Sequence, residues 1–568
     1  MIKVVIFFSY FYFFLYSVLG YGFIFQNHVI KKKINKFYIG FLGAASVTTI
    51  SYFTIFYFYH GFAHNIVIHT VGFGYFLYSY FKDENKKYIK NITLISFIFL
   101  SLILISKTHD DFAYYHLTFT KYLTENYIIF GMGHLNHGYN LPSSLFFLNS
   151  TFYFPLIKFY SFHYINVFFL IFFNYFLICQ IFVKNNILIT KLISILAIIF
   201  FNLSFNRISE YGTDKIGQLL AVIIFLDIFS KLFNNNYKNN NYIKDLFCIL
   251  FLISFLLTLK TYFISYILIA FLLVWVLKEN LIIFLLNYFK SICFILSFIL
   301  ISGFLLTNFA HTGCLVSPMS FTCFDNFFWS RELSDIIKLE NWLEQWSKAG
   351  AGPNFRVENP NVYVSKFNWI NNWYEKYFLT KVIDQIAIFA FSIILLFVFV
   401  RIKKNKNSIN YFDKRIILVN IILIIIFLIW FTKHPTLRYG GYSAVFLFLS
   451  FNIAFIFSQF ETNKNFIRNT KYLLIFIALI LNLKNFHRIN KELNREDLYR
   501  FTEFPFYKIK KLDSEYTIYE NEFKIFHPSK KNNGSNFCWD LPTPCVSGKR
   551  NLIVKKYSFY YFIYKDQF

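Results

Sequence analysis

Residues 92–116 read ITLISFIFLSLILIS-K-THDDFAYYH, an apolar run from Ile92 to Ser106 followed by a polar tract that begins at Thr108. The run predicts a helix that ends at the outer face of a membrane. Asp110 and Asp111 are adjacent carboxylates at that face. Such a pair indicates either chemistry at the membrane surface or a hydrated loop.

Composition indicates the class of protein. Hydrophobic residues are 57% of the chain and the mean hydropathy is +0.47. Apolar runs of spanning length recur from residue 4 to about residue 483, which predicts an all-α polytopic membrane protein with about fourteen transmembrane helices. The expected spans centre near residues 14, 47, 70, 98, 173, 196, 225, 251, 269, 298, 390, 423, 449 and 477.

The net charge of +26 is concentrated in short loops between spans. These basic loops contain Lys31 to Lys33, then Lys82, Lys86, Lys87 and Lys90, and then Arg401 to Lys406 with Lys414 and Arg415. The positive-inside rule places them in the cytoplasm, and this distribution argues against a nucleic-acid partner. We therefore expect a multi-pass protein of the bacterial inner membrane, surrounded by membrane lipids, with both termini on the periplasmic side.

The same topology predicts five regions. They are accessory helices (1–88), a core with an outer loop at 107–160 (89–306), an outer loop subdomain (307–379), C-terminal helices (380–484) and an outer C-terminal domain (485–568). Helical spacing in the outer loop predicts amphipathic helices along the membrane surface. The subdomain holds most Trp residues and a turn at Gly350 to Pro353. Alternation at Tyr516 to Tyr519 and Ser558 to Tyr564 predicts strands in a small mixed α/β domain.

The seven cysteines form two groups. Cys179, Cys248 and Cys293 lie within spans, where they act most simply as small packing residues. The other four lie in outer segments, and their spacing favours disulfides between Cys314 and Cys323 and between Cys538 and Cys545 in an oxidising compartment. Free thiols are the alternative.

An apolar span, an outer loop with an acidic pair, surface helices, many further spans and an outer C-terminal domain together resemble the GT-C superfamily of membrane glycosyltransferases, such as protein mannosyltransferases and aminoarabinose transferases. The resemblance covers residues 89–568 in layout, and its motif is Asp110-Asp111 with Tyr114-Tyr115-His116. Three spans precede the helix that would begin the GT-C core.

Three further tracts resemble a family of uncharacterised bacterial multispanning proteins with a GT-C layout. They are Arg207 to Asp214, Trp430 to Gly440, and the Cys538-Trp539-Asp540 to Pro544-Cys545 tail.

The resemblance implies transfer of a sugar, with inversion, from a polyprenyl-phosphate donor to a glycan, lipid or protein acceptor at the outer face. Such a reaction needs a base for the acceptor hydroxyl, and Asp110 or Asp111 suits that role. Adjacent carboxylates disfavour simultaneous ionisation when partly buried, so one of the two acts. The alternative is that an Asp caps the helix that follows.

The leaving phosphate needs cations. Arg438 follows Pro435 at an outer turn, where a guanidinium can bind a phosphate through two oxygens, and Lys433 and His434 are its neighbours. Alternatively, these side chains extend to lipid headgroups. Arg207, Glu210 and Asp214 share a short outer loop, which either contacts substrate or forms a hydrated turn of paired charges.

His116 is a further candidate for substrate binding. It also belongs, with His109, His134 and His137, to a group of histidines near the acidic pair. Plain hydrogen bonding is the simpler role for them. No cofactor and no metal ligand set is predicted, although a divalent metal bound by imidazole and carboxylate groups stays open.

Three other functions stay open. A transporter would carry ionisable residues inside spans, whereas Asp227, Lys260 and Lys290 lie near span ends. A polysaccharide polymerase or ligase would use outer arginines, and the chain offers Arg207, Arg331, Arg356 and Arg438. A structural envelope protein would not need the acidic pair.

Overall fold

The computed structural model describes residues 2–31, 35–82, 85–183, 186–233, 240–277, 280–352, 357–400, 402–404, 413–462, 465–494, 501–507, 509, 512–529, 537–548 and 551–565. Several residues of the sequence argument lie outside the described residues: Lys32, Lys33, Pro353, Arg356, Arg401, Asn405 and Lys406.

Within the described residues, eight helices are long and apolar enough to cross a membrane. They are Ile2–Ile30, Lys36–Thr54, Phe159–Phe182, Ile292–Thr312, Ile370–Phe399, Lys414–Lys433, Leu437–Ser458 and Phe466–Leu493. Leu188–Ser204 and Thr261–Leu277 are shorter apolar helices. The chain is thus mostly helical and has the character of a membrane protein, as its hydropathy predicts.

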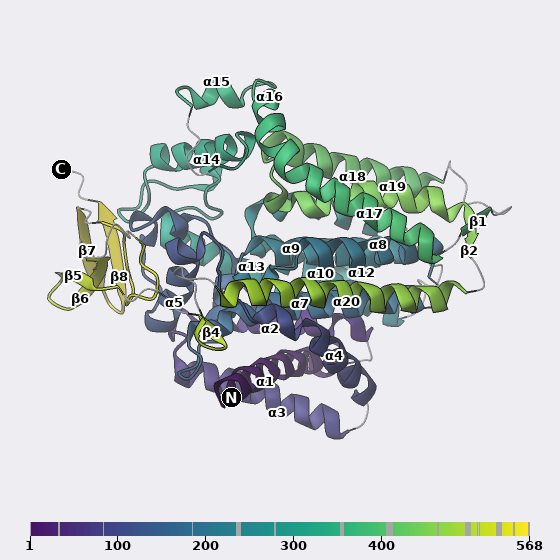
Figure 1. Ribbon diagram of the computed structural model, residues 1–568. Helices are drawn as coiled ribbons and strands as arrows, with labels where there is room; N and C mark the ends of the chain where they lie inside the picture. Colours follow the sequence, from purple (N-terminus) through teal and green to yellow (C-terminus); the bar gives the residue numbers. More distant parts are fainter. Residues whose placement is uncertain are drawn as a thin grey trace.

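The long helices lie side by side with similar directions (Figure 1). The central group is α7 (Tyr164–Phe182), α8 (Leu188–Ser204), α9 (Asp214–Leu232), α10 (Asn240–Leu259), α13 (Ile292–Thr312) and α20 (Phe466–Leu493). A second group, α17 (Ile383–Val400), α18 (Lys414–Lys433) and α19 (Tyr442–Ser458), packs on one side of it, mainly through α8. On the other side lie α1 (Ile2–Ile24), α2 (Ile39–Thr54), α3 (Phe62–Phe81) and α4 (Lys86–Phe99).

The helix expected from Ile92 to Ser106 has different bounds. The α-helical part, α4, begins at Lys86 and ends at Phe99, and the chain continues as a 3₁₀ turn, η3 (Leu100–Ile103). Arg488 of α20 donates to the carbonyls of Ser101 (3.3 Å) and Leu104 (2.8 Å). The backbone carbonyls at this end therefore find a partner outside the helix, which allows it to stop early.

The region 107–160 is mostly buried, contrary to the expectation of helices lying along the membrane surface. It contains η4 (Phe112–His116), α5 (Leu117–Glu125), η5 (Met132–His134), η6 (His137–Asn140), α6 (Ser144–Ser150) and, at its end, the start of η7 (Phe159–His163). The C-terminal tail covers it: Lys121 donates to the carbonyls of Asp540 and Leu541, and Trp539 donates to Ala113. The polar positions that suggested a water-facing side bind the tail instead.

The described part of the segment between α13 and α17 contains several short helices. It contains η11 (Ser320–Thr322), α14 (Leu333–Lys348), α15 (Pro360–Val364), α16 (Ile370–Trp373) and η12 (Tyr374–Val382). A disulfide joins Cys314 to Cys323 before α14, and a second joins Cys538 to Cys545. Both are the pairs expected from the spacing, whereas Cys179, Cys248 and Cys293 are free.

Among the described residues from Phe501 onward, the strands form antiparallel hairpins, and the helical part of the region expected at 485–568 is the end of α20. The pairs are β3 (Phe501–Glu503) with β4 (Phe506–Tyr507), β5 (Ser514–Tyr519) with β6 (Phe523–Pro528), and β7 (Leu552–Tyr557) with β8 (Tyr560–Lys565). The helix before them, α20, runs to Leu493, past the expected boundary at 485. A short antiparallel pair of strands, β1 (Ile402–Lys404) and β2 (Phe460–Thr462), lies at the opposite end of the molecule (Figure 1).

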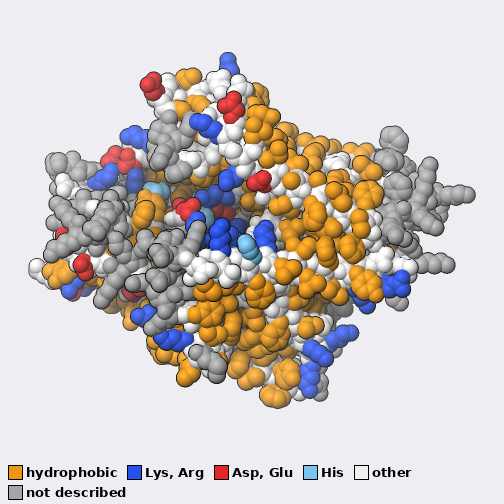
Figure 2. Space-filling view, in the orientation of Figure 1, with side chains coloured by type: hydrophobic (Ala, Val, Ile, Leu, Met, Phe, Trp, Pro, Cys, Tyr) orange, Lys and Arg blue, Asp and Glu red, His pale blue; other side chains and the backbone are white. Residues whose placement is uncertain are grey.

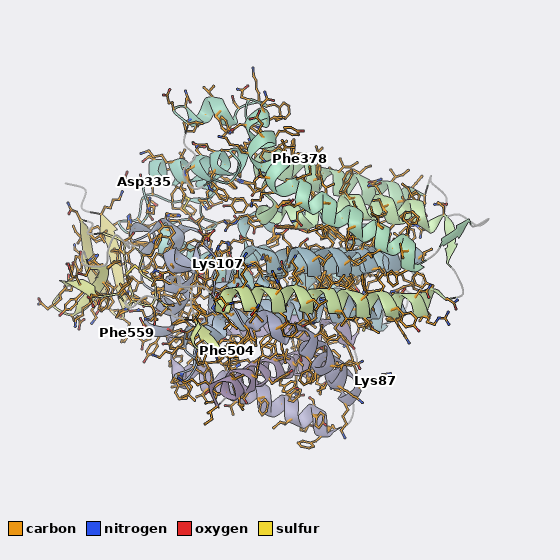
Figure 3. All side chains as sticks on the ribbon, in the orientation of Figure 1. Lys87, Lys107, Asp335, Phe378, Phe504 and Phe559 are labelled. Carbon is orange, nitrogen blue, oxygen red and sulfur yellow. A yellow bond between two sulfur atoms is a disulfide. The ribbon has the colours of Figure 1, made fainter. Side chains whose placement is uncertain are left out.

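The remaining described helices are α11 (Leu272–Leu277) and α12 (Leu281–Phe289), with the 3₁₀ segment η9 (Thr261–Phe271) before them and a π-type turn, η13 (Leu437–Gly441), between α18 and α19. Hydrophobic side chains cover much of the surface over the helices, and charged side chains gather where the helices meet the outer segments (Figure 2). Lys107 lies at this junction and Lys87 near the other end of the helices (Figure 3).

Candidate active site

Arg438 joins two carboxylates from distant parts of the chain. Its Nη2 donates to Oδ2 of Asp111 at 2.8 Å, and its Nε donates to Oδ2 of Asp214 at 2.9 Å. Asp214 is the first residue of α9, and its side chain is 7% exposed. Asp111 and Arg438 keep about 30% exposure (31% and 29%), so the cluster is partly open to its surroundings.

A rigid turn presents Arg438. Trp373 donates from its indole to the carbonyl of Pro435 (2.7 Å), and Trp430 donates to that of Thr436 (2.8 Å). Gly440 follows with φ of +86°, a conformation that glycine adopts without steric cost and other residues avoid. The two residues that precede η13 are thus each bonded to an indole, in addition to the contacts that the Arg438 side chain makes.

A second layer fixes Asp214 and the Arg438 backbone together. Tyr262 donates to the Asp214 carboxylate (3.1 Å) and lies 3.2 Å from the carbonyl oxygen of Arg438. Gln218 on α9 donates to the same carbonyl (3.3 Å) and accepts from the Ser443 amide (3.0 Å). These hydrogen bonds connect α9, η9 and α19 around the Asp214 carboxylate and the Arg438 carbonyl.

Lys260 supplies a second cation that the sequence argument did not place at this site. It is a buried residue in the chain between α10 and η9. Its charge interacts electrostatically with those of Asp214 and Arg438. Burial lowers the pKa of Lys260, and the Asp214 carboxylate opposes that effect. Its position just before Thr261, between two expected spans, was the available signal.

The two adjacent aspartates have different surroundings. The Asp110 side chain is 90% exposed and lies 3.5 Å from Lys107, whereas Asp111 faces Arg438. Asp111 precedes η4 without a capping hydrogen bond from its side chain, so helix capping does not account for it. Burial alone would raise the pKa of Asp111, but the Arg438 guanidinium is the main opposing cause, and the pKa lies below its ordinary value.

Two histidines complete this side of the cluster. His109 Nδ1 lies 3.6 Å from Oδ2 of Asp111 and accepts a hydrogen bond from the Asp111 amide (3.1 Å). His116 is fully buried, and its Nδ1 bonds the carbonyl of Tyr211 (3.0 Å). Desolvation is the main cause that lowers the pKa of His109 to about 4 and that of His116 to about 3, so both rings are neutral at neutral pH.

The loop from Arg207 to Asp214 is divided between two clusters. Asp214 joins Arg438, but Arg207 pairs with Glu210 and lies 3.5 Å from Glu492. Glu492 also accepts from Arg488 (2.8 Å) and from the Ser106 amide (3.1 Å). Arg207 and Glu210 are thus paired with one another, as the alternative interpretation of this loop proposed, and they help to hold the chain that leads to Asp111.

Lys433 and His434 lie apart from the carboxylates. Lys433 is exposed at the end of α18, and His434 Nδ1 contacts Ser347 of α14 at 3.2 Å. The ring of His434 packs against Tyr439, the residue after Arg438. Within the described part of the chain, neither residue contacts Asp111 or Asp214, so their predicted phosphate role has no support from geometry.

An apolar pocket borders the turn that carries Arg438. Leu437 and Tyr442, on either side of the arginine, are in its wall, and the rest of the wall comes from α8, η12, α17 and α19. Trp346 lies over the guanidinium, 5.6 Å from ring centre to Cζ. A cation, two carboxylates and an apolar recess are thus adjacent.

No curated protein and no solved structure matches the chain. The family model described as a domain of unknown function, DUF8201, matches residues 1–447, a range that contains Asp111, Asp214 and Arg438, and the chain belongs to that family.

Proposed function

We propose that this protein is a glycosyltransferase of the GT-C type, which transfers a sugar from a polyprenyl-phosphate donor to an envelope glycan, lipid or protein acceptor. The observation that supports it most is the contact between Asp111 and Arg438. A base and a phosphate-binding cation are two groups that the reaction needs, and this cluster contains one of each.

In this proposal Asp111 is the base. The acceptor hydroxyl oxygen attacks the anomeric carbon, its proton passes to the Asp111 carboxylate, and the bond from that carbon to the phosphate oxygen breaks. The phosphate leaves with the bonding electrons, on the face opposite the attack, so the configuration inverts. Asp110 is assigned no role, because its side chain is exposed and forms an ion pair with Lys107.

Arg438 is the proposed phosphate ligand. A guanidinium offers two parallel N–H donors to a phosphate and keeps its charge at any physiological pH. At present these donors contact Asp111 and Asp214, so a phosphate would replace one carboxylate as a partner. Lys260 adds a second positive charge that interacts with the same carboxylates. Release of Asp111 from the guanidinium would also make that carboxylate a stronger base.

The proposal includes a location. We infer about fourteen spans, with the site at the periplasmic face of a bacterial inner membrane and both termini on that side. The distribution of basic loops supports this orientation. Disulfides at Cys314–Cys323 and Cys538–Cys545, both on the side of the site, fit an oxidising compartment.

Two competing functions are less favoured. Transport would use a charge within the helices, but Asp227 and Lys231 of α9 form an ion pair with each other at 2.5 Å, which Tyr38 joins. A polymerase or ligase would use outer arginines, yet Arg207 pairs with Glu210 and Arg331 with Asp335. Both functions remain possible outcomes of the following experiment.

The test is mass spectrometry of envelope glycans and glycolipids in a deletion strain that is complemented at matched expression. Wild type and Asp110→Asn should restore a missing sugar, whereas Asp111→Asn should not. Asp110→Asn is a matched control, because it removes the neighbouring carboxylate and leaves the Arg438 contact intact. Restoration by Asp111→Asn, or a deletion that changes no glycan, would overturn the proposal.

A further inference from the structure

Three possible metal ligands converge beside Arg438. One nitrogen of His109, one nitrogen of His116 and one carboxylate oxygen of Asp111 all lie within 4.8 Å of one another. Zinc binds nitrogen and oxygen ligands at about 2.0–2.2 Å, so ligand atoms around one ion lie about 3.4 Å apart. The three atoms are therefore at most about 1.4 Å further apart than the ligands of one ion. His109 Nδ1, which lies 3.6 Å from Oδ2 of Asp111, would exchange the hydrogen bond that it accepts from the Asp111 amide for the ion.

His116 is arranged as a metal ligand. Its Nδ1 bonds the backbone carbonyl of Tyr211 at 3.0 Å; a carbonyl only accepts, so Nδ1 carries the proton. The other nitrogen, Nε2, then has a free lone pair. Nε2 is completely buried and has no hydrogen-bond partner within the described residues. Metal-binding histidines commonly use their second nitrogen in this way, to bond a carbonyl.

A buried acceptor without a partner costs free energy, so its presence calls for an explanation. The rings of His109 and His116 lie 5.3 Å apart between their centres, and one carboxylate oxygen of Asp111 lies within 4.8 Å of a nitrogen of each. Gly212 lies against the His109 ring, where an added Cβ would come within 3.2 Å of Cδ2. The local chain therefore accommodates both rings close to one carboxylate.

We propose that His109, Asp111 and His116 bind one divalent transition-metal ion, of which Zn²⁺ is the best match. Two imidazoles favour zinc, iron, nickel or copper over magnesium, calcium and manganese, which prefer oxygen ligands. Three protein ligands leave a position open for water or substrate, as in catalytic zinc sites. A bound ion would add positive charge beside Arg438, where the phosphate is proposed to leave.

Metal binding does not depend on the proposed sugar transfer and is measured directly. The probe is Co²⁺, titrated into full-length protein that has been purified in detergent and stripped with a chelator. Visible absorption reports coordination by nitrogen ligands, and elemental analysis of untreated protein reports the ion acquired in the cell. We expect saturation at about one Co²⁺ per chain.

His116→Gln and Asp111→Asn should weaken Co²⁺ binding at least about tenfold. Asp110→Asn and His137→Gln are the matched controls, a carboxylate and an imidazole of the same segment outside the cluster, and they should bind as wild type does. Gel filtration establishes that each variant is folded, and His109→Gln replaces any variant that is not. Absence of saturable binding in wild type, or equal binding by the ligand variants and the controls, would overturn the site.

If Co²⁺ binds but the deletion strain lacks no sugar, the metal site stands and the transferase proposal fails. If the sugar is lost in Asp111→Asn but wild type binds no Co²⁺, the reverse holds. The two results thus separate the two proposals.

Discussion

The guanidinium of Arg438 lies 2.8 Å from the carboxylate of Asp111, although the two residues are 327 positions apart in the chain. Asp111 precedes the turn η4, and Arg438 lies in the turn between α18 and α19. This contact joins the polar tract around Asp111 and the one around Arg438 into one site.

Replacing Arg438 by lysine tests whether transfer requires the two N–H donors of one guanidinium. Lysine keeps the charge but is a single point donor, so it cannot hold Asp214 and a phosphate in the same geometry. We expect Arg438→Lys to lower transfer at least about tenfold, since charge-assisted contacts contribute about 1.5–3 kcal/mol. Transfer is measured as the missing sugar in the complemented deletion strain. Lys433→Gln is the control, because Lys433 is exposed, and it should behave as wild type. Full activity of Arg438→Lys would speak against bidentate binding.

Glu492 is predicted to be a positioning residue. Its carboxylate binds Arg488 and the Ser106 amide, and so anchors the chain just before Asp111. Glu492→Gln should reduce the free energy of unfolding by about 1–3 kcal/mol, because a buried charged partner is lost. We expect kcat to fall while KM changes little. Lys491→Gln, an exposed neighbour on α20, is the control. A purely structural role would leave kcat of the folded protein unchanged.

The disulfide between Cys538 and Cys545 should stabilise the cover over the site. It closes the loop in which Trp539 donates to Ala113, and in which the carbonyls of Asp540 and Leu541 bind Lys121. Closing so short a loop is worth about 2–3 kcal/mol by chain entropy. The double variant Cys538→Ser/Cys545→Ser should therefore have a lower Tm and faster proteolysis near Trp539. Cys179→Ser, at a free cysteine, is the control and should change neither the Tm nor the proteolysis. Equal Tm values for wild type, the double variant and Cys179→Ser would show that the tail is held without the disulfide.

Stability should fall in mildly acidic solution because His134 and His434 are held neutral. Desolvation is the largest cause that lowers the pKa of each to about 4 from 6.5. Below pH 6.5 the unfolded chain binds protons that the folded chain does not, so unfolding becomes easier as the pH falls from 6.5 to about 4. Tm in detergent should drop over this window. His134→Gln should flatten the slope, whereas a substitution at the exposed His487 should leave it unchanged.

Apolar periodicity was sufficient to predict the helical class, and local spacing was sufficient to predict both cysteine pairs. Each depends on residues that are near one another in sequence. The same signal identified three candidates: a charged residue directly beside an apolar helix in the sequence. They are Asp111, Asp214 and Arg438.

What the sequence could not show is how distant segments meet. Nothing in Asp110-Asp111 distinguishes the two residues, because their difference is the direction each side chain takes in a turn. The burial of 107–160 depends on a tail more than 370 residues later, to which Lys121 bonds through Asp540. The early end of α4 likewise depends on Arg488 of α20. Both are tertiary effects that override local pattern.

The proposed orientation predicts that Lys87 and Lys107 lie on opposite sides of the membrane. Lys87 is at the start of α4 and Lys107 follows its end, and Figure 3 shows them at opposite ends of the helices. Single cysteines placed at each position can be labelled with a membrane-impermeant maleimide. Lys107→Cys should react in spheroplasts with an intact inner membrane, whereas Lys87→Cys should react only after permeabilisation. The unmodified chain is the control for Cys179, Cys248 and Cys293, of which the last two are buried. The opposite labelling pattern would place Arg438 and Asp111 in the cytoplasm, where a lipid-linked donor exposed at the periplasmic face could not reach them.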